Sequence, residues 1–123
     1  MPFFRRRRAT TPTPAPGLVP PPSRRSAQEL AAAEAHLSDF ARSRPGVEAY
    51  IEPRTAVTDA TVVFVAATGE WTRRRVSSPQ QAQALARALG IPAYDAEVVG
   101  YPRRMRDWTR KRAEEDKRRL DGV

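Results

Sequence analysis

Arginine is the residue type whose number and spacing point most directly to a chemistry in this chain. Lysine and arginine together number 22 against 14 aspartates and glutamates, which gives a formal net charge of +8. Ten arginines fall into three groups, namely Arg5, Arg6, Arg7 and Arg8, then Arg73, Arg74 and Arg75, and then Arg103, Arg106 and Arg110. A guanidinium binds phosphate through paired hydrogen bonds and stacks on bases. The three groups therefore predict contacts with phosphate, although codon usage in a GC-rich genome is an alternative origin of the arginines.

Few residues in the chain could support another kind of chemistry. The chain has one histidine and no cysteine, which leaves out disulfides, thiol nucleophiles and a histidine-based zinc site. Its 6 glycines are scattered and form no phosphate-binding loop, and no nucleophile elbow is present. We therefore expect a protein that is not an enzyme and that uses no cofactor and no metal.

The first 25 residues differ in composition from the rest. Seven of the 12 prolines lie between Pro2 and Pro22, and this stretch cannot supply the backbone donors of a helix or sheet. Residues 1–25 are thus predicted to be a disordered arm in which Phe3 and Phe4 precede the first arginine group. The arm suits phosphate contacts with base stacking, an anionic membrane surface, or simply a solubilising tail. No stretch of the chain is apolar enough to span a membrane.

Residues 26–101 carry the patterns of a small folded domain. Ser26 to Glu29 has the form of a capping box and predicts a helix over 26–43, with His36 half-buried beside its apolar stripe. Ser78 and Pro79 start a second helix, which Gly90 ends.

Four segments of this domain have strand character. Residues 47–51 alternate, 61–67 are apolar enough for a central strand, 71–76 return from them, and 94–99 alternate again. The glycine of Thr68-Gly69 predicts a two-residue type II′ turn between the second and third strands.

The third strand places Trp71 on the same face as Arg73 and Arg75, with Arg74 on the other. One interpretation is an edge strand whose charges prevent aggregation. The other is a platform on which Trp71 stacks a base while the arginines hold phosphate.

A second proline-started helix occupies 102–123. Tyr101, Met105 and Trp108 share one face of this helix and should pack on the domain. Arg103, Arg106, Arg110 and Lys117 lie in a narrow arc on another side, which predicts either a phosphate-binding stripe or a solvated mixed-charge helix. Beyond Trp108 we expect the helix to project into water, where it is also suited to bind a partner protein.

These elements predict an α+β fold, with a small antiparallel sheet of three to four strands packed by two helices. The order helix, three strands, helix resembles that of double-stranded-RNA-binding domains. Those domains begin their second helix with a lysine-rich phosphate clamp, whereas this chain has Ser77, Ser78 and Pro79 there, so no family is assigned.

Charge is distributed unevenly along the chain. The net charge is +6 over 1–25, −3 over 26–60, +1 over 61–100 and +4 over 101–123. We therefore expect a small, basic, cytoplasmic binding protein that contacts RNA or DNA through its arginines with low sequence specificity. The alternative is an interaction adaptor or accessory subunit that binds an acidic protein, with the arm touching an anionic membrane surface.

Overall fold

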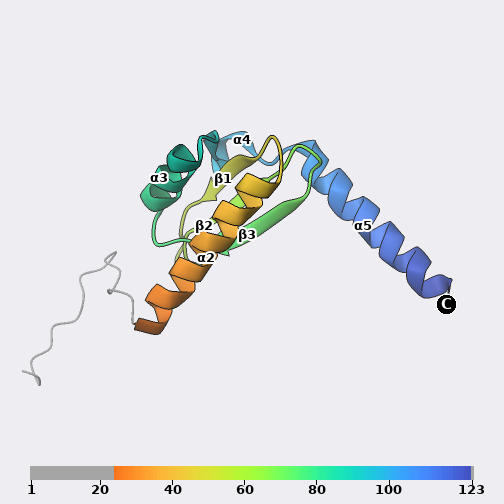
Figure 1. Cartoon of the computed structure of the whole chain (residues 1–123), viewed down its shortest axis with the longest axis horizontal. Helices are drawn as coiled ribbons and strands as arrows, with labels where there is room; N and C mark the ends of the chain where they lie inside the picture. Colours follow the sequence, from red (N-terminus) through yellow and green to blue (C-terminus); the bar gives the residue numbers. More distant parts are fainter. Residues whose placement is uncertain (1–23, 123) are drawn as a thin grey trace, which may run out of the picture.

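A four-stranded mixed sheet forms the centre of the computed structural model, which describes residues 24–122 (Figure 1). The strand order is β3-β2-β1-β4, and the α+β class predicted from the sequence is confirmed. The elements in chain order are α2 (Arg24–Ser43), β1 (Glu48–Glu52), β2 (Thr61–Val65), β3 (Trp71–Arg75), α3 (Pro79–Leu89), β4 (Ala93–Asp95), α4 (Ala96–Val99) and α5 (Arg103–Asp121).

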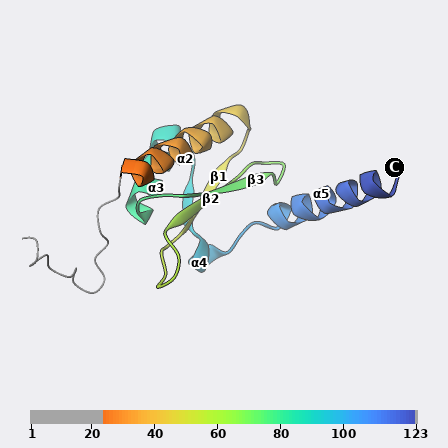
Figure 2. The same ribbon diagram turned by 90° about the horizontal axis from the view of Figure 1, so that it is seen from below.

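Helices α2 and α3 cover one face of the sheet, which we call the first face. Figure 2 shows both helices on the same side of the strands. Leu37 and Phe40 of α2 pack with Val62 and Phe64 of β2 in the main hydrophobic core. These four side chains are at most 4% exposed, so most of the apolar burial that stabilises the domain lies on this face.

The opposite, second face is covered by the last part of the chain. Val63 and Val65 of β2 and Tyr50 of β1 pack there against Ala96 of α4 and Met105 of α5. Because Val62, Val63, Phe64 and Val65 are all fully buried, β2 is the central strand buried on both faces that the sequence predicts.

The β2–β3 hairpin is confirmed, but its predicted two-residue turn is wrong. The Ala66 amide donates to the Glu70 carbonyl (2.8 Å), and the Gly69 amide donates to the Ala66 carbonyl (2.9 Å). Residues 67–69 therefore form a three-residue loop, in which Gly69 takes a φ of +97°. Loops of this length usually place a glycine at the last position, since few other residues adopt a positive φ there.

The fourth strand departs from the prediction in length and direction. Only Ala93–Asp95 is a strand, and it pairs in parallel with β1, with Tyr50 opposite Tyr94. The remainder of the predicted strand is the short helix α4, because the side chain of Asp95 accepts from the Glu97 amide and caps it (2.9 Å). The sheet is therefore mixed, and its antiparallel part is β1 to β3.

The ends of α3 are those that the sequence predicts. Ser78 caps the helix by accepting from the Gln81 amide (3.0 Å), and Pro79 follows at the first position. At the other end Gly90 has a φ of +72°, and the Ile91 amide donates to the Ala86 carbonyl (3.0 Å). This bonding pattern is that of a Schellman motif.

Two predicted helix starts are shifted. Helix α2 already begins at Arg24, so Ser26 lies inside it and is not its cap. Helix α5 begins at Arg103, and Pro102 precedes it as a cap residue without a side-chain hydrogen bond. Pro102 suits either the cap position or the first position of α5, because the fixed φ of proline matches the start of a helix.

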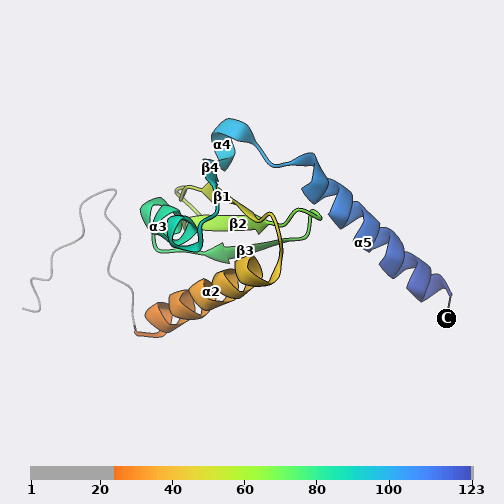
Figure 3. The same ribbon diagram turned by 45° about the horizontal axis from the view of Figure 1, so that its top comes forward.

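Helix α5 docks only by its first turns and then leaves the body of the protein. Figures 1 and 3 show it extending away from the sheet, and every residue from Lys111 to Asp121 is exposed. The docked end lies against Gly69, where an added Cβ would overlap the carbonyl oxygen of Arg104 and come within 3.0 Å of the Trp108 Cβ. Gly69 is therefore required both for its positive φ and for this close approach.

We expect Gly69→Ala to loosen the docking of α5. Gly90→Ala is the matched control, since Gly90 also has a positive φ but no atom lies within 4 Å of its added Cβ. The control should lose about 1–2 kcal/mol of unfolding free energy for backbone strain alone, and Gly69→Ala at least about 1 kcal/mol more. Tryptophan emission should shift to longer wavelength in Gly69→Ala only. Equal losses with unshifted emission would contradict the close approach.

Candidate nucleic-acid interface

Trp71 opens strand β3 on the second face, as the alternation of residues predicts. Its side chain packs against the small core of that face, and its indole N–H donates to the Thr109 hydroxyl of α5 (2.8 Å). The guanidinium of Arg73 lies 5.5 Å from the ring centre. Trp71 is thus half-buried as part of the docking site of α5, whereas the stacking platform, one of the two interpretations of this strand, needs a ring face that is free for a base.

Arg73 of β3 forms a bidentate ion pair with Glu52 of β1, across β2. Its Nε and Nη2 donate to the two carboxylate oxygens of Glu52 (2.9 and 3.1 Å). Glu52 also accepts from the hydroxyls of Thr61 and Tyr101. Burial raises the pKa of Glu52, but these hydrogen bonds outweigh it and leave the pKa below its usual value. The carboxylate therefore stays charged and neutralises Arg73.

The other two arginines of β3 also have partners within the protein. Arg75 forms ion pairs with Glu29 of α2 (3.3 Å) and with Asp59 of the β1–β2 loop (3.4 Å). Arg74 lies on the first face and donates to the Thr72 hydroxyl (3.1 Å) and to the carbonyl of Arg73 (2.8 Å). Two of these three guanidiniums thus have carboxylate partners within the protein. Charged side chains of this kind are typical of an edge strand, which β3 is.

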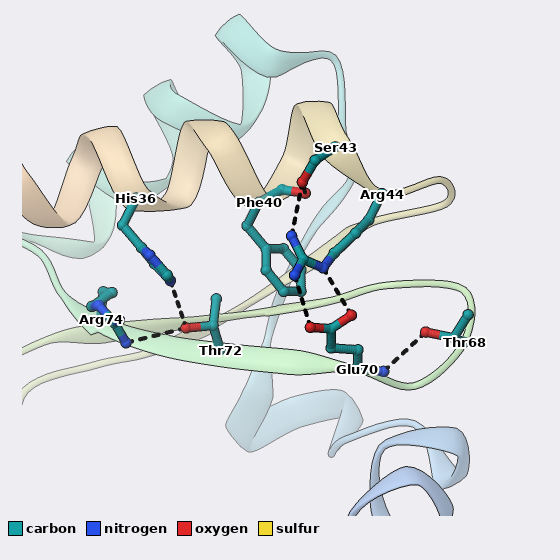
Figure 4. Close-up of polar contacts among 8 residues, drawn as sticks. All are labelled: His36, Phe40, Ser43, Arg44, Thr68, Glu70, Thr72 and Arg74. Atoms are coloured by element: carbon teal, nitrogen blue, oxygen red, sulfur yellow. Dashed lines mark hydrogen bonds and ion pairs between the residues drawn. The ribbon is translucent and has the colours of Figure 1, made fainter.

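His36 of α2 and Arg44, the residue that follows its end, connect this part of the chain to the β2–β3 hairpin, as Figure 4 shows. The Nε2 atom of His36 lies 2.9 Å from the Thr72 hydroxyl, and Arg44 donates from Nε and Nη2 to the two oxygens of Glu70 (both 2.8 Å). The Arg44 guanidinium also lies 4.3 Å from the centre of the Phe40 ring. His36 is thus the half-buried packing residue that the sequence predicts.

The third arginine group lies on the side of α5 that faces away from the body. At 100° per residue, Arg103, Arg106 and Arg110 form an arc whose centre lies about 160° around the helix from the centre of the docked face of Met105 and Trp108. All three are exposed. Among residues 24–122, Arg103 and Arg106 have no ion-pair partner, and Arg110 has Asp107 (3.4 Å) and Glu114 (4.0 Å). Such exposed pairs are weak and exchange readily.

Arg104 is a docking residue of α5 that the sequence pattern did not single out. It belongs to the docked face, where its Nε donates to the Ala66 carbonyl (2.9 Å) and its Nη2 to Glu48 (2.8 Å). The hydrogen bond from Arg104 lowers the pKa of Glu48 against the opposing effect of burial. The spacing of four residues between Arg104 and Trp108 is the one sequence signal that could have separated Arg104 from its exposed neighbours.

The structure therefore separates the predicted site residues into three places. Arg5, Arg6, Arg7 and Arg8 lie outside the described residues. Trp71 and the arginines of β3 are engaged with the body, whereas those of α5 point into solvent. Residues 26–102 contain 7 arginines and 9 acidic residues, a net charge of −2, whereas α5 has 9 basic and 5 acidic residues, a net charge of +4. Positive charge in the described part is thus concentrated on α5.

Comparisons with known proteins add nothing to this geometry, since no family model, curated protein or solved structure matches the chain. Over residues 24–122, no three histidine, aspartate or glutamate side chains converge as metal ligands would. None of the described helices has the length and apolar character needed to cross a bilayer.

We expect the stability of the fold to depend on pH through His36, the only histidine of the chain. Burial, followed by the charges of Arg74 and Arg44, lowers the pKa of His36 below its usual 6.5. The unfolded chain therefore binds this proton more readily, and the unfolding free energy should fall as the pH drops below about 6.5. Chemical denaturation at pH 7.5 and 5.5 measures the effect.

His36→Gln is the control for this pH dependence, because glutamine keeps a polar group near Thr72 without titrating. The wild type should lose stability relative to the variant between pH 7.5 and 5.5. The carboxylates of Glu48, Glu52 and Glu70 have pKa values lowered from 4.5, so they contribute only below this window. Parallel losses in both proteins would refute a role for His36.

Proposed function

We propose that this protein is a small, non-enzymatic module that binds RNA or DNA through arginine–phosphate contacts. The observation that carries the proposal is the exposed cationic face of α5, opposite the side by which the helix docks. Arg103, Arg106 and Arg110 have their guanidiniums in solvent and no strong partner among the described residues. A helix of this kind presents several cations in a row to a phosphate backbone.

The contribution of the body to this binding is small. Arg73 and Arg75 are neutralised by carboxylates, and a phosphate would have to displace these partners. Trp71 is engaged with α5. We therefore assign affinity to α5 together with Arg5, Arg6, Arg7 and Arg8 of the arm. Phosphate contacts position a protein without reading sequence, so low specificity and a steep dependence on salt should accompany binding.

We expect the triple change Arg103→Gln, Arg106→Gln and Arg110→Gln to weaken binding to a duplex in filter-binding titrations. The slope of log affinity against log salt should become shallower by about 3, since each phosphate contact contributes about 0.9 on B-DNA. Circular dichroism checks that the helix content is unchanged.

A control with the same loss of charge is available on the body. Arg42, Arg54 and Arg87 are exposed, and none forms an ion pair within residues 24–122. Changing these three to glutamine should leave the slope nearly unchanged. If the slope of log affinity against log salt falls equally in both triple variants, binding depends only on overall charge and not on the face of α5. If the wild type itself has a flat slope, the proposal is wrong. Glutamine at Arg5 to Arg8 tests the arm in the same assay.

A second candidate function, protein binding by an adaptor, is favoured by apolar exposure near the β4 edge. Tyr94 is 38% exposed, Val98 78% and Val99 55%. Apolar residues gathered on a surface are a common mark of a protein interface. Pull-downs with and without nuclease separate the two functions, because partners held through nucleic acid are lost after nuclease treatment and directly bound proteins are retained.

A further inference from the structure

A small hollow on the second face is lined by all three tyrosines of the chain. It has a volume of about 190 Å³ and lies between β1, β4 and the segment that leads from α4 into α5. The ring centre of Tyr50 lies 5.4 Å from that of Tyr94 and 6.1 Å from that of Tyr101. Tyr50 and Tyr94 are also paired residues of neighbouring strands, so the sheet fixes their spacing.

The one ionised side chain that lines the hollow is Glu48. Its Oε1 accepts two hydrogen bonds, from the Tyr50 hydroxyl and from Arg104 (both 2.8 Å). Within residues 24–122 no hydrogen bond reaches its Oε2. A carboxylate has room for about four donors, so this oxygen can accept from an N–H group of a ligand.

Two of the three tyrosines, Tyr50 and Tyr101, remain neutral and donate their hydroxyls to carboxylates. Burial, and then the hydrogen bond to Glu48, raises the pKa of Tyr50 to about 12. Burial and the hydrogen bond to Glu52 likewise raise the pKa of Tyr101. A phenol that donates to a carboxylate gains electron density in its ring, and the negative face of an aromatic ring attracts cations.

We propose that this tyrosine hollow binds the head group of an organic cation, namely a guanidinium or a primary ammonium. The cation lies against the tyrosine rings and donates an N–H to Oε2 of Glu48. The volume suits a head group, since pockets for whole drug-sized ligands are larger, about 300–1,000 Å³. Because the ligand is a cation, this site is separate from the phosphate-binding face of α5 and does not depend on the proposed function.

The experiment is an NMR titration of the full chain with three probes of similar size, followed at the backbone amides of Tyr94 and Gly100. Ethylguanidinium has both the charge and the N–H donors and should bind in a saturable way. Tetramethylammonium keeps the charge without N–H groups and should bind more weakly. Ethylurea keeps the N–H groups without the charge and should cause no saturable shift.

Tyr94→Leu tests the rings, since the 38% exposure of Tyr94 makes its replacement tolerable to the fold. The variant should bind ethylguanidinium about five- to tenfold more weakly, whereas Tyr94→Phe should bind as the wild type does. Val98→Ala is the matched control, because Val98 is exposed on the adjacent α4 but does not line the hollow.

Three results would overturn the proposal. They are the absence of a saturable shift with ethylguanidinium, equal affinity for ethylurea, and unchanged affinity in Tyr94→Leu. Glu48→Gln adds a test of the carboxylate and should also weaken ethylguanidinium binding. Because Glu48 also accepts a hydrogen bond from Arg104, the thermal unfolding of Glu48→Gln is measured in parallel. If Glu48→Gln does not fold, the Tyr94 variants decide the outcome.

Discussion

The close approach of Gly69 to the first turn of α5 is the constraint on which the second face of the sheet depends. Val63 and Val65 have no helix layer above them like the one that α2 and α3 provide on the first face, so the last part of the chain must cover them. With no side chain at Gly69, the backbone of α5 comes near enough for Arg104 to bond the Ala66 carbonyl. The same geometry directs the opposite side of α5 into solvent.

The arginines are divided in the same way between docked surfaces and the exposed face of α5. Arg44, Arg73 and Arg104 each form an ion pair that joins separate segments, with Glu70, Glu52 and Glu48 respectively. In each of these pairs both side chains are at most 43% exposed, so solvent screens them less than it screens the pairs along α5. Arginine thus has two uses in one chain, holding the body together and providing an exposed cationic face.

Local signals in the sequence were sufficient for the three long helices, apart from the exact starts of α2 and α5, and for the pairing of β2 with β3, because Ser78, Gly90 and the apolar run of β2 act within a few residues. They did not predict α4 or the three-residue loop of the hairpin. The direction of β4 and the partners of the β3 arginines were not predictable in this way. Arg73 meets Glu52 across 21 positions of sequence, and β4 returns beside β1 after two strands and a helix. Such pairings are set by tertiary packing, and no periodic pattern in the sequence indicates them.

The parallel pairing of β1 with β4 also has a consequence for synthesis on the ribosome. The meander of β1, β2 and β3, with α2 beside it, is complete once residue 75 has emerged, whereas β4, α4 and α5 follow later. Until then Val63, Val65 and Tyr50 have nothing to cover them, and a nascent chain with such an apolar face is prone to aggregate. Emergence of α5 from the exit tunnel is therefore the step that covers the second face of the sheet.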